Sequence, residues 1–418
     1  MRKNVSIIVI LLALFANSAI GQTQRCGTSE KMKMSLERNP ELRKKRQALQ
    51  AFTEQWSQQA YKTTAASTVI TIPVVVHVVY KKAAENISKA QILSQIDVLN
   101  EDFRAMNSDI SGVPSVWTSL IADCQIEFVL ANKTPGGQYT SGITRTETTV
   151  ADWGGSDNVK YTSLGGHDAW PNDKYLNIWV CNIGANYLGF AYQPNGTIPA
   201  EDGVVIGYKV FGTTGTISST YKLGRTSTHE IGHYFNLDHL WGPEDDNLSC
   251  IESDNVDDTP VQAEANFDCE TFPHVSCSNG PNGDMFNNFM DYSDDHCMFF
   301  FTEGQKTRML AALNGERASL KTSNGYVVGI EETFAAKSLT VFPSPANNLV
   351  NISLNHANAA QVDLAVFDMV GKQVLFNPNI NLKNTTHQMD VSALPTGFYM
   401  LKVSAKNISA TRKFSIVK

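Results

Sequence analysis

The pattern of apolar and polar residues changes several times along this chain, and each pattern predicts a different kind of region. Val5–Ala16 is a short apolar run behind two basic residues, and residues 22–67 are polar and helix-prone. From Val69 onward, strands rich in Val and Ile alternate with amphipathic helical stretches. After residue 338, short alternating runs are separated by turn residues, which is typical of a small all-β sandwich.

The region from residue 68 to 325 is predicted to be an α+β domain, with helices around one twisted mixed sheet. Ser88 opens an amphipathic helix, and the capping-box pair Thr302 and Gln305 opens a later helix that we expect to continue to Leu320. The predicted strands are Ile70–Tyr80, Gln125–Ala131, Tyr175–Cys181, Gly203–Tyr208 and a short edge strand at Leu188–Tyr192.

The stretch from Gly242 to Asn288 is rich in Asp, Asn, Gly and Cys and has little periodicity. It is too long for an ordinary loop, so we expect covalent cross-links to hold it. The cysteines available for them are Cys250, Cys269, Cys277 and Cys297, and their spacing allows three pairings. Cys124 and Cys181 lie in predicted strands, where they either pair or remain buried thiols, and the second reading is favoured.

The amino terminus is typical of an exported protein. Arg2 and Lys3 precede the apolar run, and small residues follow it, so residues 1–21 are predicted to be a signal peptide cut after Gly21. Residues 22–67 then lie between a signal and a folded domain, which predicts a propeptide. Its basic stretch, Lys31–Arg46, is by its charges alone a solvated helical face.

Composition and charge exclude some classes of partner. The 418 residues are 42% hydrophobic and carry a net charge of −7, which fits a soluble globular protein of two or three units. An acidic balance gives no electrostatic reason to expect nucleic acid as a partner. Beyond the first residues, no apolar run is long enough to cross a bilayer. Nothing in the sequence predicts the oligomeric state.

A cluster of histidines carries the strongest chemical signal. Residues 229–239 read His-Glu-Ile-Gly-His-Tyr-Phe-Asn-Leu-Asp-His. On a helix, His229 and His233 share one face, and Glu230 projects beside them, where it can act as a general base without binding the metal. His239 is too far along for that face, so the chain must turn back to deliver it. Three imidazoles leave zinc an open fourth position, as in catalytic sites.

The chance occurrence of this pattern is low, at about 0.0002 per chain for the full set of residues. A purely structural zinc site is disfavoured by Glu230 in the position of the base. The turn falls at Asn236, a residue type that tolerates a left-handed backbone. Asp238 is predicted either to orient a ligand imidazole or, more simply, to be an exposed acid of the turn.

These residues resemble the long zinc motif of the metzincins, His-Glu-x-x-His-x-x-Gly-x-x-His, with Asn236 in place of the usual Gly. Asn288–Tyr292 resembles the metzincin Met-turn, which implies that Met290 lies under the metal site. Tyr292 would then lie near the metal, where its phenol could stabilise an oxyanion. The resemblance thus implies a metzincin catalytic domain with a disulfide-bonded, irregular carboxy-terminal part.

Within the metzincins, residues 70–320 are most similar to the pappalysin-like family. Local marks are Asp254–Pro260 and the segment from Met290 to Gln305. The resemblance implies two disulfides, Cys250–Cys277 and Cys269–Cys297. It also implies a calcium site made by Asp254, the Val256 carbonyl and Thr259, the alternative being an Asp-rich turn that caps backbone amides.

Two further residues gain a role from the resemblance. Asp295 is similar to the acid at the base of the pocket for the residue after the scissile bond, which implies a preference for Arg or Lys there; the alternative is a surface acid. Cys26 is similar to the cysteine switch of some metzincin propeptides, in which a thiolate binds zinc and holds the zymogen inactive; the alternative is a free thiol. If Asp295 selects basic residues, Arg43–Arg46 becomes a candidate region for self-processing.

Residues 338–418, behind a linker at 326–337, resemble the sorting domain of type IX secretion. The marks are Phe342–Ala346, Val366–Gly371 and Leu394–Tyr399, followed by a last strand that ends in Lys. This implies that the secretion machinery is a partner and that the protein is secreted or lies on the cell surface. A carbohydrate- or protein-binding sandwich is the alternative, disfavoured because no aromatic platform is evident.

Together these patterns predict a secreted zinc endopeptidase made as a zymogen, with protein or peptide substrates. Two other classes stay open. A non-catalytic adhesin or binding protein would keep the sandwich but tolerate a decayed site, and a zinc amidase of another substrate would lack the Met-turn. A digest of casein or a peptide library, with and without a zinc chelator, distinguishes the three.

Overall fold

The computed structural model describes residues 24–60, 68–218, 220–243, 250–326, 339–354, 361–382, 385–405 and 408–418. The chain divides into two compact units, Met1–Tyr326 and Val327–Lys418. The predicted signal peptide and residues 327–337 of the predicted linker lie outside the described residues. Among the described helices, none has the length and apolar character needed to span a membrane.

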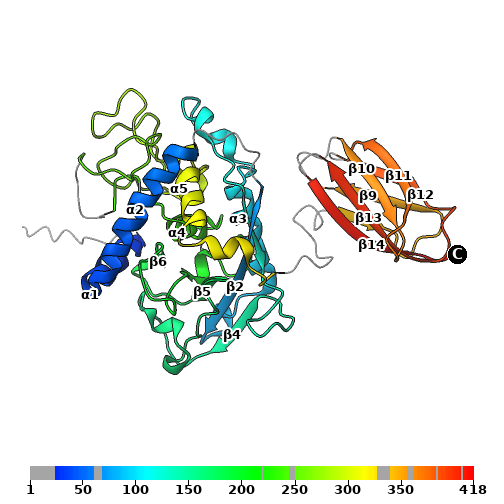
Figure 1. Cartoon of the computed structure of the whole chain (residues 1–418), viewed down its shortest axis with the longest axis horizontal. Helices are drawn as coiled ribbons and strands as arrows, with labels where there is room; N and C mark the ends of the chain where they lie inside the picture. The colour runs from blue at the N-terminus through cyan, green and yellow to red at the C-terminus, as the bar shows by residue number, and fades with distance from the viewer. Residues whose placement is uncertain are drawn as a thin grey trace, which may run out of the picture. The chain divides into compact units, whose positions relative to one another are not determined.

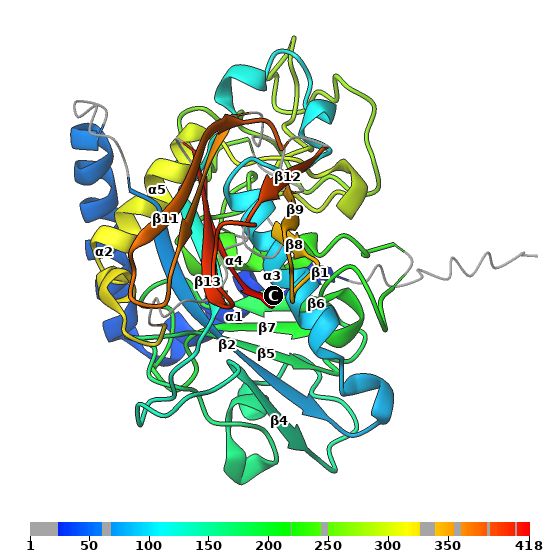
Figure 2. The same ribbon diagram turned by 90° about the vertical axis from the view of Figure 1, so that its right-hand side faces the viewer.

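The first unit is built on a mixed sheet, as predicted. Its strands are β1 (Gln24–Cys26), β2 (Ile70–Tyr80), β3 (Ile126–Leu130), β4 (Ile143–Glu147), β5 (Leu176–Cys181), β6 (Tyr187–Ala191) and β7 (Val204–Gly207). Their order is β1-β6-β7-β5-β2-β3, with β4 also paired to β2 (Figure 2). The pair β6–β7 is antiparallel, and the other recorded pairs of this sheet are parallel. Strands β1 and β4 were not predicted.

The prediction that residues 188–192 form an edge strand is wrong for the described structure. β6 does form there, but β1 of the predicted propeptide pairs alongside it, with Gln24 opposite Tyr187 and Cys26 opposite Gly189. Since strand pairing satisfies backbone groups that an edge leaves open, the propeptide covers this side of the sheet.

Five α-helices accompany the sheet in the described residues. They are α1 (Thr28–Arg38), α2 (Pro40–Ala60), α3 (Lys89–Phe103), α4 (Arg225–Tyr234) and α5 (Glu303–Asn314). Figure 1 shows α2, from the predicted propeptide, running alongside α5. Short 3-10 helices cover Ala83–Glu85, Ile110–Gly112, Thr118–Leu120, Asp157–Lys160, Thr162–Leu164, Tyr208–Val210, Asp295–Cys297 and Ala318–Thr322.

The predicted helix starts are confirmed, but one predicted end is wrong. Ser88 caps α3, and Thr302 and Gln305 form the capping box of α5. Helix α5 ends at Asn314 and does not continue to Leu320, because Gly315 interrupts it. A Cβ on Gly315 would lie 2.8 Å from the Phe52 ring, so the missing side chain lets α2 approach closely here.

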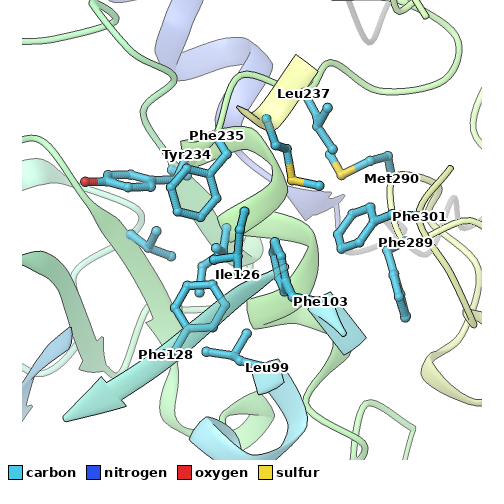
Figure 3. Close-up of a cluster of buried hydrophobic side chains, with 14 of the residues drawn as sticks. Leu99, Phe103, Ile126, Phe128, Tyr234, Phe235, Leu237, Phe289, Met290 and Phe301 are labelled. Atoms are coloured by element: carbon cyan, nitrogen blue, oxygen red, sulfur yellow. The ribbon is translucent and has the colours of Figure 1, made fainter. Parts of the chain in front are cut away.

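The core of this unit joins the sheet to α3, α4 and the segment after Asn288. Phe103, Phe128, Phe235 and Phe301 form a chain of neighbouring rings, and Leu237 and Met290 lie at one end of the same cluster (Figure 3). Every residue of α4 is buried. The helix that carries the histidines is therefore fixed on all sides by packing, which suits a rigid site.

The irregular segment is cross-linked as the resemblance implied. Disulfides join Cys250 to Cys277 and Cys269 to Cys297. Cys124 and Cys181 are free and buried, as favoured from the sequence. Burial raises the pKa of both thiols, which keeps them protonated and unreactive.

The second unit is a two-sheet, all-β structure, as predicted. Its strands are β8 (Leu339–Phe342), β9 (Leu349–Leu354), β10 (Val362–Phe367), β11 (Gln373–Ile380), β12 (Thr386–Asp390), β13 (Gly397–Ala405) and β14 (Ile408–Ile416). One sheet has the order β11-β10-β13-β14 and the other β12-β9-β8. Strand β12 was not predicted. Alternate residues of the strands form a separate apolar core, so this unit has its own source of stability.

Candidate metal centre

The three predicted zinc ligands come together. The Nε2 atoms of His229, His233 and His239 lie 3.0 to 3.3 Å from one another. A tetrahedral ion bound at about 2.0 Å would separate its nitrogens by about 3.3 Å, so the arrangement fits zinc. Together with Cys26 Sγ, these atoms form one of the groups in the described residues that could hold a metal ion, and all four residues are buried.

The turn that delivers His239 forms as predicted from Asn236. This residue has φ = 77°, in the left-handed region where Gly is usual and Asn is tolerated. The turn is closed by backbone bonds from Asn236 N to His233 O (2.8 Å) and from Leu237 N to Gly232 O (3.1 Å). His239 then stacks on the Trp241 ring, with the ring centroids 4.5 Å apart.

The imidazoles are oriented through their other nitrogens. His229 Nδ1 lies 2.8 Å from Phe289 O, and His233 Nδ1 lies 2.8 Å from Leu237 O. His239 Nδ1 contacts Ser29 Oγ of the propeptide at 3.2 Å. Because each Nδ1 has a polar partner, each Nε2 is left to face the metal position. Such partners usually orient the imidazole rings that bind a metal. Burial lowers the pKa of His229, favouring the neutral form that binds metal.

Glu230 lies in direct contact with the predicted propeptide. Its Oε2 accepts a hydrogen bond from Thr28 Oγ1 at 2.9 Å and lies 3.4 Å from Cys26 Sγ. The Thr28 hydroxyl also accepts from Ala191 N of β6, at 2.9 Å. Thr28 therefore bridges the sheet and the carboxylate. No role was predicted for Thr28 or Ser29, because neither contact follows from local spacing.

Met290 lies beneath the metal-binding helix. A Cβ built on Gly232 of α4 would be 2.5 Å from Met290 Sδ, so the missing side chain lets the sulfur pack against the helix. Leu237 is the neighbour of Met290 in the apolar cluster (Figure 3). The Tyr292 ring packs against His239, with centroids 4.9 Å apart, and its hydroxyl donates to Cys26 O at 3.4 Å.

Asp295 is 1% exposed, so it is not a surface acid. Its Oδ1 is 3.1 Å from Nη2 of Arg25, the residue before Cys26, and its Oδ2 accepts from Leu223 N at 2.8 Å. The same Nη2 also lies 2.8 Å from Met298 Sδ. Burial raises the pKa of Asp295, and the Arg25 guanidinium opposes that rise.

The predicted calcium ligands also lie together. Thr259 Oγ1 is 2.8 and 2.9 Å from the two Asp254 carboxylate oxygens and 2.9 Å from Val256 O. Burial raises the pKa of Asp254 to about 8. A buried carboxylate with converging oxygens is a suitable donor set for a hard cation. Asp254 Oδ1 also accepts from Val256 N at 3.1 Å, so the amide-capping contact is present as well.

A buried charged network supports α4 from behind. Arg225 pairs with Asp102 and Asp109, and Thr228 Oγ1 donates to Asp102 Oδ2 at 2.6 Å. Asp238 is also buried, which corrects the exposed-acid reading, and it pairs with Arg308 at 3.2 Å. These groups are far apart in the sequence, so spacing could not reveal them.

The basic cluster at residues 43–46 lies inside α2. A helix would have to unwind before it could lie extended in a protease cleft. Self-processing at this cluster in the folded propeptide is therefore disfavoured, although the sequence made it a candidate.

Comparison with known proteins gives a consistent family. A family model described as pregnancy-associated plasma protein-A matches residues 161–314, and one described as a secretion system C-terminal sorting domain matches residues 340–418. An extracellular metalloprotease of Arthroderma otae is 30% identical over 258 residues, which cover 60% of this chain and 80% of that protein. One of Pyricularia oryzae is 31% identical over 318 residues, which cover 72% and 93%.

Two solved structures from Tannerella forsythia are similar as well. Mature mirolysin in complex with a cleaved peptide is 50% identical, with a TM-score of 0.59, and the match covers 61% of this chain and 96% of that chain. A promirolysin mutant is 44% identical, with a TM-score of 0.65, and the match covers 72% and 97%. The larger share of this chain that promirolysin covers is consistent with a zymogen.

Proposed function

Because this chain belongs to the pappalysin-like metzincins, a family of zinc metallopeptidases, we propose that it is a secreted endopeptidase made as a zymogen. The observation that carries the proposal is the convergence of three imidazole Nε2 atoms beside Glu230 in a buried site. The carboxy-terminal sorting domain gives it the secretion machinery as a partner. Proteins or peptides are its substrates.

His229, His233 and His239 would hold the zinc ion. When bound, zinc supplies a Lewis acid that polarises the substrate carbonyl and acidifies water. Three neutral imidazoles leave the fourth position open for that chemistry, which is why a histidine-only set suits catalysis. Met290 supports the site by packing under α4 at Gly232.

Glu230 is proposed as the general base. It takes a proton from the attacking water and passes it to the leaving amine as the peptide bond breaks. Tyr292 lies against His239, so its hydroxyl can donate a hydrogen bond to the developing oxyanion once Cys26 has left. Gly189 allows Glu230 to lie close to β6, because a Cβ there would be 3.0 Å from Glu230 Cγ.

Cys26 is proposed to hold the enzyme inactive before the propeptide is removed. Its sulfur lies among the three imidazole donors, where it supplies the fourth ligand, and also beside the base. Strand β1 fixes the thiol there by pairing with β6. Removing the propeptide would open both the metal position and Glu230.

Asp295 is proposed to select Arg or Lys just after the scissile bond. The contact with Arg25 supports this role, because its guanidinium already pairs with the buried Asp295 carboxylate. Arg25 directly precedes Cys26, whose thiol lies in the metal group. A substrate cation would replace the Arg25 guanidinium on activation. Asp254, Val256 O and Thr259 are proposed to bind a structural calcium ion that steadies the irregular segment.

The test is cleavage of a casein or peptide library by the mature enzyme, with cleavage sites mapped. Substituting Glu230→Ala should lower kcat by about 10²–10⁴-fold, the usual worth of a general base, and leave zinc binding intact. A zinc chelator should abolish cleavage, and added zinc should restore it. Absence of cleavage by zinc-loaded mature protein would favour the adhesin, and cleavage of non-peptide amides alone would favour the amidase.

A further inference from the structure

One residue of the basic cluster in α2 differs from its neighbours. Arg43, Lys44 and Lys45 are exposed, whereas Arg46 is partly buried. Its Nη1 donates to Asn236 Oδ1 at 2.7 Å and to Pro194 O at 3.3 Å, and its Nη2 donates to Gln193 Oε1 at 2.7 Å. Two nitrogens of one guanidinium thus meet three carbonyl-type oxygens, and a compact lysine ammonium cannot reproduce this planar fork.

One of these acceptors, Asn236, belongs to the loop that delivers His239, whereas Gln193 and Pro194 follow β6. Asn236 is the left-handed residue of that turn, at the position where the related zinc motif has Gly. A Gly would have no side-chain oxygen for Arg46. Gln193 is tied to the same loop, because its Nε2 donates to Leu237 O at 2.8 Å and to Asp238 Oδ1 at 2.6 Å. The Asp238 carboxylate adds a negative charge near the guanidinium.

The surrounding face of α2 is shaped to bring Arg46 to this loop. With Arg46 included, Leu42, Leu49 and Thr53 recur at three- and four-residue spacing on one helical face, and these three residues are at most 7% exposed. Thr53 Oγ1 also lies 3.5 Å from Asn236 Nδ2, so Asn236 contacts two positions of α2 that are about two turns apart. Helix α2 packs along α5 beside this point (Figure 1).

We propose that Asn236, Gln193 and Pro194 form a receptor for the Arg46 guanidinium, and that the propeptide grips the metal-binding loop there, separately from Cys26. The inference rests on the proposed zymogen and deepens it. Release of Cys26 alone then leaves α2 docked on the loop that carries His239. Full activation requires both contacts to open, and Asn236 serves as a recognition residue for the propeptide as well as a turn residue.

The experiment compares Arg46→Ala with Arg43→Ala in the full chain, before any cut, as verified by mass spectrometry. Both residues belong to the propeptide, so the mature enzyme is the same in every case. Hydrogen exchange of the α2 amides from Arg46 to Thr53 should accelerate by about tenfold or more in Arg46→Ala, because hydrogen bonds from a charged group are lost. Arg43→Ala should leave the rates unchanged.

A second measurement uses peptidase activity of the uncut chain in the Cys26→Ala background. Adding Arg46→Ala should raise it by about tenfold, and adding Arg43→Ala should not. Arg46→Lys keeps the positive charge and the helix propensity but not the three contacts, so its activity should be intermediate. This variant is the control for misfolding of the alanine variant. Equal exchange rates in the Arg46 and Arg43 variants would overturn the receptor. Faster amide exchange in Arg46→Ala, in a protein that never cleaves peptides, would support the receptor for Arg46 and reject the proposed peptidase function.

Discussion

Cys26 Sγ lies 3.4 Å from Glu230 Oε2 and within the group of imidazole donors, so one thiol touches both the base and the metal position. We expect Cys26→Ala to raise the peptidase activity of the uncut full chain by at least about tenfold, because an alanine cannot supply the fourth ligand. The activity is measured on a quenched peptide while the chain is verified as intact. Cys124→Ala, which removes a buried thiol outside the group of imidazole donors, is the control. Equal activity in wild type and Cys26→Ala would contradict the switch.

Asp295 and Asp294 are adjacent acids with different environments, since Asp295 is buried and Asp294 is partly exposed. We expect Asp295→Asn in the mature enzyme to lower kcat/KM for peptides with Arg after the scissile bond, because a buried cation loses its charged partner. The expected loss of transition-state stabilisation is about 2–4 kcal/mol. Peptides with a neutral residue there should change little. Asp294→Asn should behave as wild type in the same assay. Retention of the Arg preference by Asp295→Asn would assign specificity elsewhere.

The sequence could predict the metal ligands because two of them lie one helical turn apart and the third follows a turn with a recognisable residue type. It could not predict Thr28, Ser29 or Arg46 as site residues. Their contacts join positions more than 140 residues apart, as for Arg46 and Gln193. Such contacts depend on how the propeptide docks, and a single sequence has no local pattern that encodes docking.

At the scale of elements, α4 and the Met-turn meet where Gly232 allows Met290 to approach. We expect Gly232→Ala to lower the stability of the first unit by about 1–3 kcal/mol, because the new Cβ would lie 2.5 Å from Met290 Sδ. The better helix propensity of Ala opposes this by up to about 1 kcal/mol. Thermal unfolding of the full chain measures the change. Gly397→Ala, whose Cβ would meet Tyr399 at 3.7 Å, is the control and should have little effect.

The acidic loop should show a pH dependence of its own. Burial raises the pKa of Asp254 to about 8, above its usual value, so the folded state holds this proton more tightly than the unfolded state. Without calcium, the contribution of Asp254 to stability is largest in acid and falls as pH rises towards 8. Calcium binds the ionised carboxylate, so millimolar calcium should restore stability at pH 8.

Chemical denaturation at pH 5 and pH 8, with calcium or with a calcium chelator, measures this effect. Asp254→Asn should remove both the loss of stability at pH 8 and the response to calcium. Asp257→Asn, which changes an exposed acid in the same loop, should retain both. A wild-type chain that is indifferent to calcium at pH 8 would reject the cation site.

Helices and strands with a strong apolar period or a clear cap were predicted well, whereas a strand that forms only by pairing with a distant part of the chain was not. β2 has the predicted bounds, and the helix starts at Ser88 and Thr302 follow from their caps. β1 was missed because three residues form a strand there only by pairing with β6. The end of α5 was missed although Gly315, which directly follows the last residue of this helix, is a local stop signal.

At the scale of the whole molecule, the predicted propeptide is part of the first unit's fold. It contributes a strand to the catalytic sheet and a helix along α5, so removing it exposes surfaces as well as the metal position. The second unit has its own two sheets and core, and no predicted site residue falls within it. Chemistry and export are therefore assigned to different units of the chain.

This separation predicts that a chain ending at Tyr326 keeps its catalysis and loses its export. After propeptide removal, the truncated enzyme should cleave a test peptide with kcat/KM within about twofold of the full-length mature enzyme, because the first unit has its own core. Expressed in the native host, it should accumulate inside the cell envelope, because the sorting domain at residues 340–418 is absent. Full-length Glu230→Ala is the matched control, which should reach the outside without activity. If the truncated protein reached the medium at wild-type levels, export would not need the second unit. If the folded truncated enzyme failed to cleave the peptide, catalysis would depend on the second unit.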